Sequence, residues 1–189
     1  MNELKSLGLG PELADELSQF MSDRAVEALL FAARAHFGQT RKFSGLAYIN
    51  HPANVGRLAF FWGFGEPAVM AGFLHDVLED CESVTEEEIA NHFSDEVTTL
   101  VVELTEVRTE GNRATRQAAE CERLAGVSRL AQSVKCLDII DNAKDFPPDE
   151  GFGKVWQAEK LELLKVLNPC VPDIARMAGD SLNAMGPFS

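Results

Sequence analysis

Long apolar stretches and basic side chains are both scarce in this chain of 189 residues. No run of about 18 apolar residues occurs, so we expect no transmembrane helix. Residues 1–10 lack a basic start followed by an apolar block, which argues against a signal peptide. Lys and Arg number 17 against 30 Asp and Glu, a net charge of −13. A chain this acidic lacks the basic footprint that general DNA or RNA binding needs, although local cations or a bound divalent ion can still hold a small polyanion.

Cysteine is also infrequent, and no C-x-x-C pair occurs among Cys81, Cys121, Cys136 and Cys170. This spacing indicates reduced thiols in a cytoplasmic protein and not a disulfide framework. Hydrophobic residues make up 46% of the chain, which suffices for one core. We therefore expect a single domain over residues 1–189.

The apolar residues that are present recur at helical spacing nearly throughout, and no alternating run of strand length occurs. Pro52 and Pro67 suit first helical turns, and Thr85 with Glu88 forms a capping-box pattern. The pattern predicts helices that begin near residues 22, 85 and 94, and further helices over 52–63, 67–80, 113–125, 129–144 and 152–167. The fold class that follows is all-α.

The most informative stretch is the run 71–80, because it places His75 and Asp76 side by side in apolar surroundings. Asp is rarely buried unless it is paired, and a metal ion is one such partner. Glu79 and Asp80 follow one helical turn later, on the same face if the helix is regular. Three carboxylates and an imidazole in one turn would repel each other without a cation. With one, they form a metal site with acid and base groups beside it.

Two further residues extend this set. His51 lies in the segment 48–52 ahead of the run, and Asp138 lies in the segment 135–142 after it, each on an expected helix. We take His51, His75, Asp76 and Asp138 as the metal ligands. Imidazole and carboxylate together suit Mn²⁺, Fe²⁺ or Zn²⁺.

This order of His, His-Asp and a distant Asp resembles the HD-domain phosphohydrolases. With the segments 36–42 and 48–52, it is similar to the hydrolase domain of the RelA/SpoT family, over about residues 25–167. The resemblance implies an HD-type helical bundle, Mn²⁺ as the ion, and Glu79 and Asp80 as the pair that positions and deprotonates the attacking water. It implies degradation of ppGpp or pppGpp, with a guanine nucleotide as the partner. The chain has no room for the family's synthetase domain, so we expect a stand-alone small hydrolase, and an oligomer is possible.

The same resemblance assigns the substrate contacts. Arg41 would pack on the guanine base and Lys42 would hold phosphate, since a guanidinium plane stacks on a purine and an ammonium attracts phosphate. The remaining candidates for ribose or phosphate are Ser44, Asn142, Arg113 and Arg116. For the basic residues, ordinary solvated surface charge is the alternative.

Two positions depart from the family pattern. Cys81 stands where a Thr is usual after the Glu-Asp pair, and Ile139 stands where an Arg is common after the last metal-binding Asp. Neither change removes a ligand, but the missing Arg bears on how substrate is gripped. The alternatives that remain are a related nucleotide phosphohydrolase, such as an NADPH 2′-phosphatase or a 3′-nucleotidase, and a non-catalytic nucleotide sensor.

Overall fold

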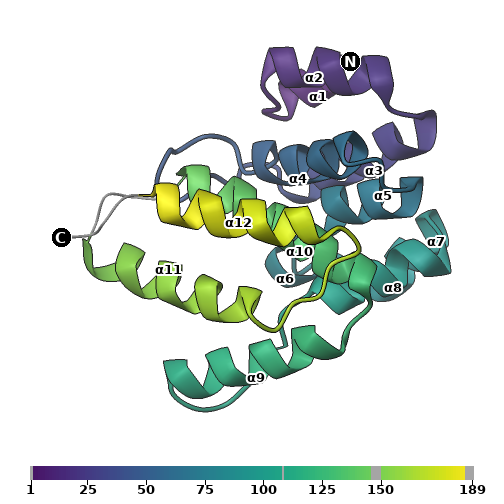
Figure 1. The fold of residues 1–189 in the computed structure, drawn as a ribbon. Helices are drawn as coiled ribbons and strands as arrows, with labels where there is room; N and C mark the ends of the chain where they lie inside the picture. The colour runs from purple at the N-terminus through teal and green to yellow at the C-terminus, as the bar shows by residue number, and fades with distance from the viewer. Residues whose placement is uncertain (1, 108, 146–149, 186–189) are drawn as a thin grey trace. The chain divides into compact units, whose positions relative to one another are not determined.

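The computed structural model describes residues 2–107, 109–145 and 150–185, and this part of the chain is helical apart from its connecting loops (Figure 1). Within it, the only β pairing is an isolated antiparallel bridge between Thr40 and Ala47. The all-α prediction is therefore confirmed. The described helices include none that is both long and apolar enough to cross a membrane. The chain divides into two compact units, Met1–Thr105 and Glu106–Ser189, and the single-domain expectation stays a prediction.

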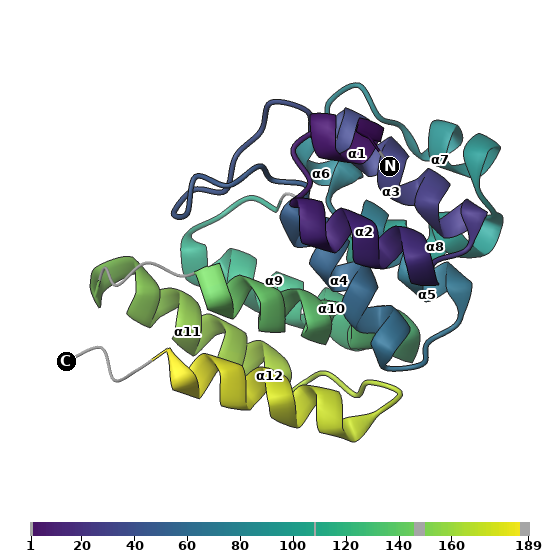
Figure 2. The ribbon, with the colours of Figure 1, turned by 90° about the horizontal axis from the view of Figure 1, so that it is seen from above.

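The first unit is built around α5, whose seven buried residues leave almost no polar face. A helix that is apolar on all sides belongs at the centre of a fold, and α5 packs against α3, α4 and α8. Figure 2 shows this group of helices from above. The helices of the unit are α1 (Asn2–Ser6), α2 (Pro11–Phe20), α3 (Asp23–Ala35), α4 (Asn50–Phe61), α5 (Glu66–Leu74), α6 (Val77–Asp80), α7 (Glu86–His92) and α8 (Asp95–Leu104).

Helix starts follow the expected local chemistry. The side-chain oxygens of Ser22, Thr85 and Ser94 each accept a hydrogen bond from the backbone N–H three residues later, at the N-caps of α3, α7 and α8. Pro52 lies in the first turn of α4, and Pro67 lies at the start of α5. These local signals were therefore sufficient to locate the starts of five helices of the unit. The sequence reasoning assigned no helix to residues 2–20, where α1 and α2 lie.

The expected continuous helix over 67–80 was wrong, because the chain breaks at His75 and Asp76. His75 ends α5, and Asp76 precedes the short helix α6. The Nδ1 atom of His75 lies 2.9 Å from the carbonyl oxygen of Gly72. In an unbroken helix this carbonyl would accept from the N–H of Asp76. The imidazole contacts that carbonyl at the point where α5 ends and the chain turns.

Two glycines allow α4 and α5 to approach closely. A methyl carbon added to Gly72 would lie 2.8 Å from the Cα atom of Gly56 and 2.9 Å from its nitrogen. A methyl added to Gly56 would overlap the ring of Phe73. Because these distances are below van der Waals contact, the two backbones can meet only where neither residue carries a side chain. The same two helices carry His51, in the first turn of α4, and His75, at the end of α5.

The second unit consists of α9 (Arg113–Gly126), α10 (Arg129–Asn142), the 3₁₀ turn η1 (Ala143–Asp145), α11 (Glu150–Leu164) and α12 (Pro172–Ala184). Helix α10 is largely buried and packs on α12, which also contacts α11. The expected helix over 152–167 ends early, at Leu164, because Lys165 and Val166 bond to carbonyls three residues back. Such bonds tighten the last turn of a helix.

Candidate metal centre

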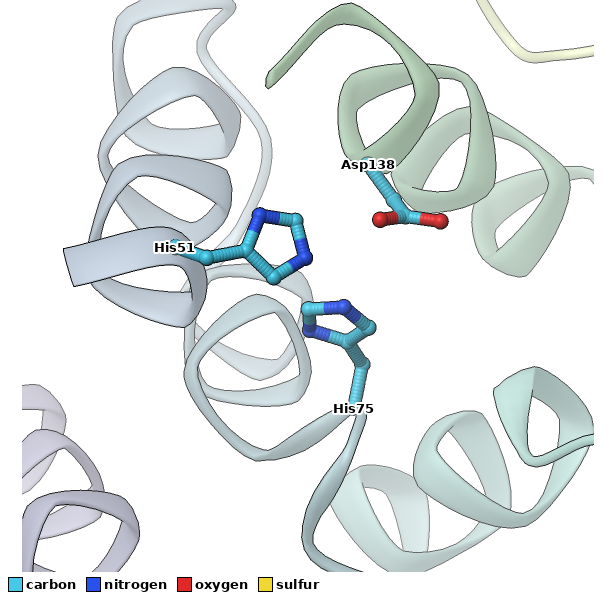
Figure 3. Close-up of side chains that lie close together, drawn as sticks. All are labelled: His51, His75 and Asp138. Carbon is cyan, nitrogen blue, oxygen red and sulfur yellow. The ribbon is translucent and has the colours of Figure 1, made fainter. Parts of the chain in front are cut away.

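The site in the first unit begins with two buried imidazoles. His51 lies in the first turn of α4 and His75 at the C-cap of α5, and each is 3% exposed. Their ring centroids lie 5.1 Å apart with the planes at 74°, an arrangement seen in Figure 3. His51 lies on α4 and His75 at the end of α5, the two helices that meet closely at Gly56 and Gly72.

Hydrogen bonding fixes which nitrogen of His75 can bind a cation. The carbonyl of Gly72 can only accept, so the Nδ1 atom of His75 carries the proton and the Nε2 atom keeps its lone pair. A backbone carbonyl that holds the second imidazole nitrogen is the usual support of a metal-binding histidine. The buried pair therefore suits a metal ion.

Asp76 brings a carboxylate to both imidazoles. Its Oδ2 atom lies 3.1 Å from the Nε2 atom of His75 and 3.6 Å from the Nε2 atom of His51. The same oxygen accepts a hydrogen bond of 2.8 Å from the hydroxyl of Tyr48. The three side chains that the sequence analysis grouped within residues 51–76 are thus brought together. Tyr48 was missed as a site residue, although its place three residues before His51 was a signal.

Glu79 and Asp80 lie on α6, one turn after Asp76, and both residues are exposed. Partial burial of its carboxyl raises the pKa of Asp80, the charge of Asp76 raises it further, and the nearby hydroxyl of Tyr48 lowers it. A carboxyl with a raised pKa is better suited to accept a proton near neutral pH. The side-chain amide of Gln39 donates to the backbone carbonyl of Asp80 at 3.0 Å and so anchors the end of α6.

Cys81 directly follows α6, and the side chain of His36 contacts it. The Nδ1 atom of His36 lies 2.7 Å from the Oε1 atom of Gln39 and 3.4 Å from the Sγ atom of Cys81. Burial lowers the pKa of His36 and raises that of Cys81 to about 11, so the imidazole is neutral and the thiol is protonated. A protonated thiol is a poor nucleophile.

Asp138 belongs to the second unit, where it is buried on α10. Its Oδ2 atom lies 2.8 Å from the ammonium of Lys135, and its Oδ1 atom accepts from the amide of Asn142. Lys135 was not singled out in the sequence, although it precedes Asp138 by one turn. The expected substrate contact of Asn142 stays a prediction.

The donor atoms of this protein are of the kind that a divalent metal ion takes. His51, His75 and Asp138 supply two imidazoles and a carboxylate, all buried (Figure 3). Mixed nitrogen and oxygen donors suit first-row divalent ions.

The predicted substrate residues near residue 40 lie in the loop between α3 and α4. The guanidinium of Arg41 lies over the ring of Tyr48 at 5.9 Å, and the ammonium of Lys42 lies over the ring of Phe43 at 5.3 Å. The hydroxyl of Ser44 is exposed. Arg41 is thus connected to the metal-binding segment through an aromatic ring.

The two basic residues predicted in the second unit have protein partners. Arg113 makes two hydrogen bonds to the carboxylate of Glu159, at 2.6 and 2.9 Å. Arg116 donates to the carbonyl of Gly111 at 2.7 Å. Both side chains are exposed, and their role in holding phosphate stays a prediction.

Known proteins resemble this chain in both sequence and fold. The profile of the HD domain family matches residues 28–138. The guanosine-3′,5′-bis(diphosphate) 3′-pyrophosphohydrolase MESH1 of Xenopus tropicalis is 38% identical over 146 residues, which is 75% of this chain and 79% of that protein. The guanosine-3′,5′-bis(diphosphate) 3′-pyrophosphohydrolase of Vibrio cholerae is 39% identical over 93 residues, 47% of this chain and 13% of that protein.

Among solved structures, a metazoan ortholog of SpoT superposes with a TM-score of 0.78 at 24% identity, covering 88% of this chain and 98% of that chain. This likeness shows the fold. The family profile spans more than half of the chain, and the Xenopus relative is similar over most of its length. The chain therefore belongs to the HD domain family, in the group that contains the MESH1 hydrolases.

Proposed function

We propose that this protein hydrolyses ppGpp or pppGpp at the ribose 3′ position, giving GDP or GTP and pyrophosphate. The observation that carries the proposal is its 38% identity to a guanosine-3′,5′-bis(diphosphate) 3′-pyrophosphohydrolase over most of both chains. The paired imidazoles of His51 and His75 with the carboxylate of Asp76 support it, because a divalent ion held by such groups can activate water for phosphoryl hydrolysis near neutral pH.

The residues that would hold the ion are His51, His75, Asp76 and Asp138, and the ion we propose is Mn²⁺. The tautomer of His75 fits this role, since its Nε2 lone pair is held toward the carboxylate of Asp76. A divalent ion, when bound, lowers the pKa of a water molecule and polarises a phosphoryl oxygen. The assignment of Asp138 rests on the family pattern and on its buried carboxylate.

Glu79 and Asp80 would perform the proton transfers. A water oxygen attacks the phosphorus bonded to the ribose 3′ oxygen, the bond from that phosphorus to the 3′ oxygen breaks, and the 3′ oxygen takes up a proton. Glu79 would position the water, and Asp80, whose pKa is raised by partial burial, would accept its proton. Both residues lie one turn from Asp76, within reach of the ligand-bearing segment.

Basic residues would hold the nucleotide. Arg41 would stack on the guanine base, and Lys42 and Ser44 would contact phosphate from the same loop. Asn142, Arg113 and Arg116 are the candidates in the second unit. A guanidinium that already lies over an aromatic ring, as Arg41 lies 5.9 Å from the centroid of Tyr48, loses less freedom when a purine covers its other face.

The deciding experiment is a product analysis. The protein is stripped with a chelator, reloaded with Mn²⁺ and incubated separately with ppGpp, NADPH and a 3′-nucleotide. Pyrophosphate and GDP from ppGpp are the expected products. Release of orthophosphate from NADPH or from the 3′-nucleotide, with ppGpp unchanged, would contradict the proposal, as would ppGpp binding without turnover.

A further inference from the structure

The chain contains a single tyrosine, Tyr48, and it lies at the junction of the metal-binding and loop residues. Its hydroxyl donates to the Oδ2 atom of Asp76 at 2.8 Å. That oxygen is also the one nearest the Nε2 atoms of His51 and His75. The tyrosine therefore contacts the very carboxylate atom that faces both imidazoles.

The ring of Tyr48 is held from several sides, so its hydroxyl has little freedom. Its centroid lies 4.9 Å from the ring of His36 and 5.9 Å from the ring of His51. The backbone N–H of Tyr48 donates to the carbonyl of Gln39 at 2.9 Å, next to the bridge that joins Thr40 to residue 47. A group fixed by packing and by backbone hydrogen bonds can hold another side chain in one orientation.

The ring of Tyr48 also contacts the loop between α3 and α4. The guanidinium of Arg41 lies 5.9 Å from the centroid of Tyr48. One side chain thus contacts the proposed base-binding residue through its face and the proposed metal ligand Asp76 through its hydroxyl. Since the two contacts use different parts of the side chain, substitutions can separate them.

We propose that Tyr48 is a positioning residue for the metal centre: its hydroxyl orients the carboxylate of Asp76 toward His51 and His75, and its ring supports Arg41. The inference deepens the proposed function and rests on it for the identity of the nucleotide. Asp76 lies in the turn between α5 and α6. Outer hydrogen bonds of this kind set the orientation of a ligand carboxylate.

Two substitutions separate the roles. Tyr48→Phe keeps the ring and removes the hydroxyl, whereas Tyr48→Leu removes both. Calorimetric titration of the chelator-treated protein with Mn²⁺ should show about 10–100-fold weaker binding for Tyr48→Phe, the usual cost of losing an outer-sphere partner. At saturating Mn²⁺, the KM of Tyr48→Phe for ppGpp should equal that of the wild type, and Tyr48→Leu should raise it.

A matched control is Thr105→Val, which removes a hydroxyl that donates to the carbonyl of Val101 at 2.8 Å, at the end of α8. Its Mn²⁺ affinity should match that of the wild type. If Tyr48→Phe also binds Mn²⁺ as the wild type does, the inference is wrong. Failure of the wild type to hydrolyse ppGpp while it binds Mn²⁺ overturns the proposed function instead, and leaves the metal result for Tyr48 intact.

A second measurement needs no substitution, so it does not depend on whether a variant folds. Because Tyr48 is the only tyrosine, replacing tyrosine by 3-fluorotyrosine gives one ¹⁹F resonance. Titration with the diamagnetic ion Zn²⁺ should shift that resonance with the stoichiometry found by calorimetry. A resonance that stays in place while Zn²⁺ binds would show that the hydroxyl does not follow the metal centre, and would overturn the inference.

Discussion

The crossing of α4 and α5 at Gly56 and Gly72 gives a prediction that reaches from packing to metal binding. We consider Gly72→Ala, the smallest change that adds a side chain there. The new methyl carbon would lie 2.8 Å from the Cα atom of Gly56 and 3.2 Å from the carbonyl carbon of Val55. Both neighbours are backbone atoms, so no side chain can rotate away and the two helices must separate.

Overpacking of this kind costs about 1–3 kcal/mol. Alanine recovers about 0.5–1 kcal/mol through its higher helix propensity. The net loss in the free energy of unfolding is therefore on the order of 1–2 kcal/mol, or a fall in Tm of roughly 2–8 °C for a chain of this size. Because His51 and His75 lie on the two helices that separate, Mn²⁺ affinity should also fall.

The assay is thermal unfolding in the presence of a chelator, followed by titration with Mn²⁺. Gly126→Ala is the matched control, since a methyl at this helical position in α9 meets no atom within 4 Å. It should leave Tm unchanged or raise it, with wild-type metal affinity. A Gly72→Ala protein as stable as the wild type, with the same affinity for Mn²⁺, would refute the argument that this backbone contact spaces the two histidines.

Three further substitutions test the proposed roles. Asp76→Ala should abolish Mn²⁺ binding and ppGpp turnover while circular dichroism keeps its helical signal, and a stoichiometric metal with full activity would rule out the site. Glu79→Gln should lower kcat by roughly a hundredfold, the scale for a positioned acid–base group, with metal content retained; loss of metal instead would make Glu79 a ligand. Arg41→Ala should raise the KM for ppGpp about tenfold, because stacking is worth on the order of 1–2 kcal/mol, with kcat less affected; an unchanged KM contradicts base stacking.

Local sequence was sufficient for the helical class and for most helix starts. Ser22, Thr85 and Ser94 cap their helices as expected, because a capping hydrogen bond forms within one turn of chain. The adjacent His75 and Asp76 and the family order of residues also led to the proposed donor set. The family match and the buried His and Asp side chains support a divalent metal ion. These features depend on residues close in sequence or on a pattern of residue types.

The sequence did not reveal a local break in one helix or a contact between two distant segments. The helix over 67–80 was expected to be continuous because Glu79 and Asp80 follow His75 and Asp76 at helical spacing, but the chain breaks at His75 and Asp76, where the imidazole of His75 contacts the carbonyl of Gly72. The hydrogen bond from Tyr48 to Asp76 joins a loop to the turn after α5, and no periodicity encodes it.

The sequence by itself thus determined which side-chain chemistry is available: the imidazoles of His51 and His75 and several carboxylates, in a helical chain with few cations. Tertiary structure decided how those groups meet. The close approach of Gly56 to Gly72 brings together the two helices that carry the histidines, and the hydroxyl of Tyr48 contacts the Asp76 carboxylate across 28 residues of chain. The physical reason is that donor type is a property of each side chain, whereas separation and orientation arise only when helices pack at close range.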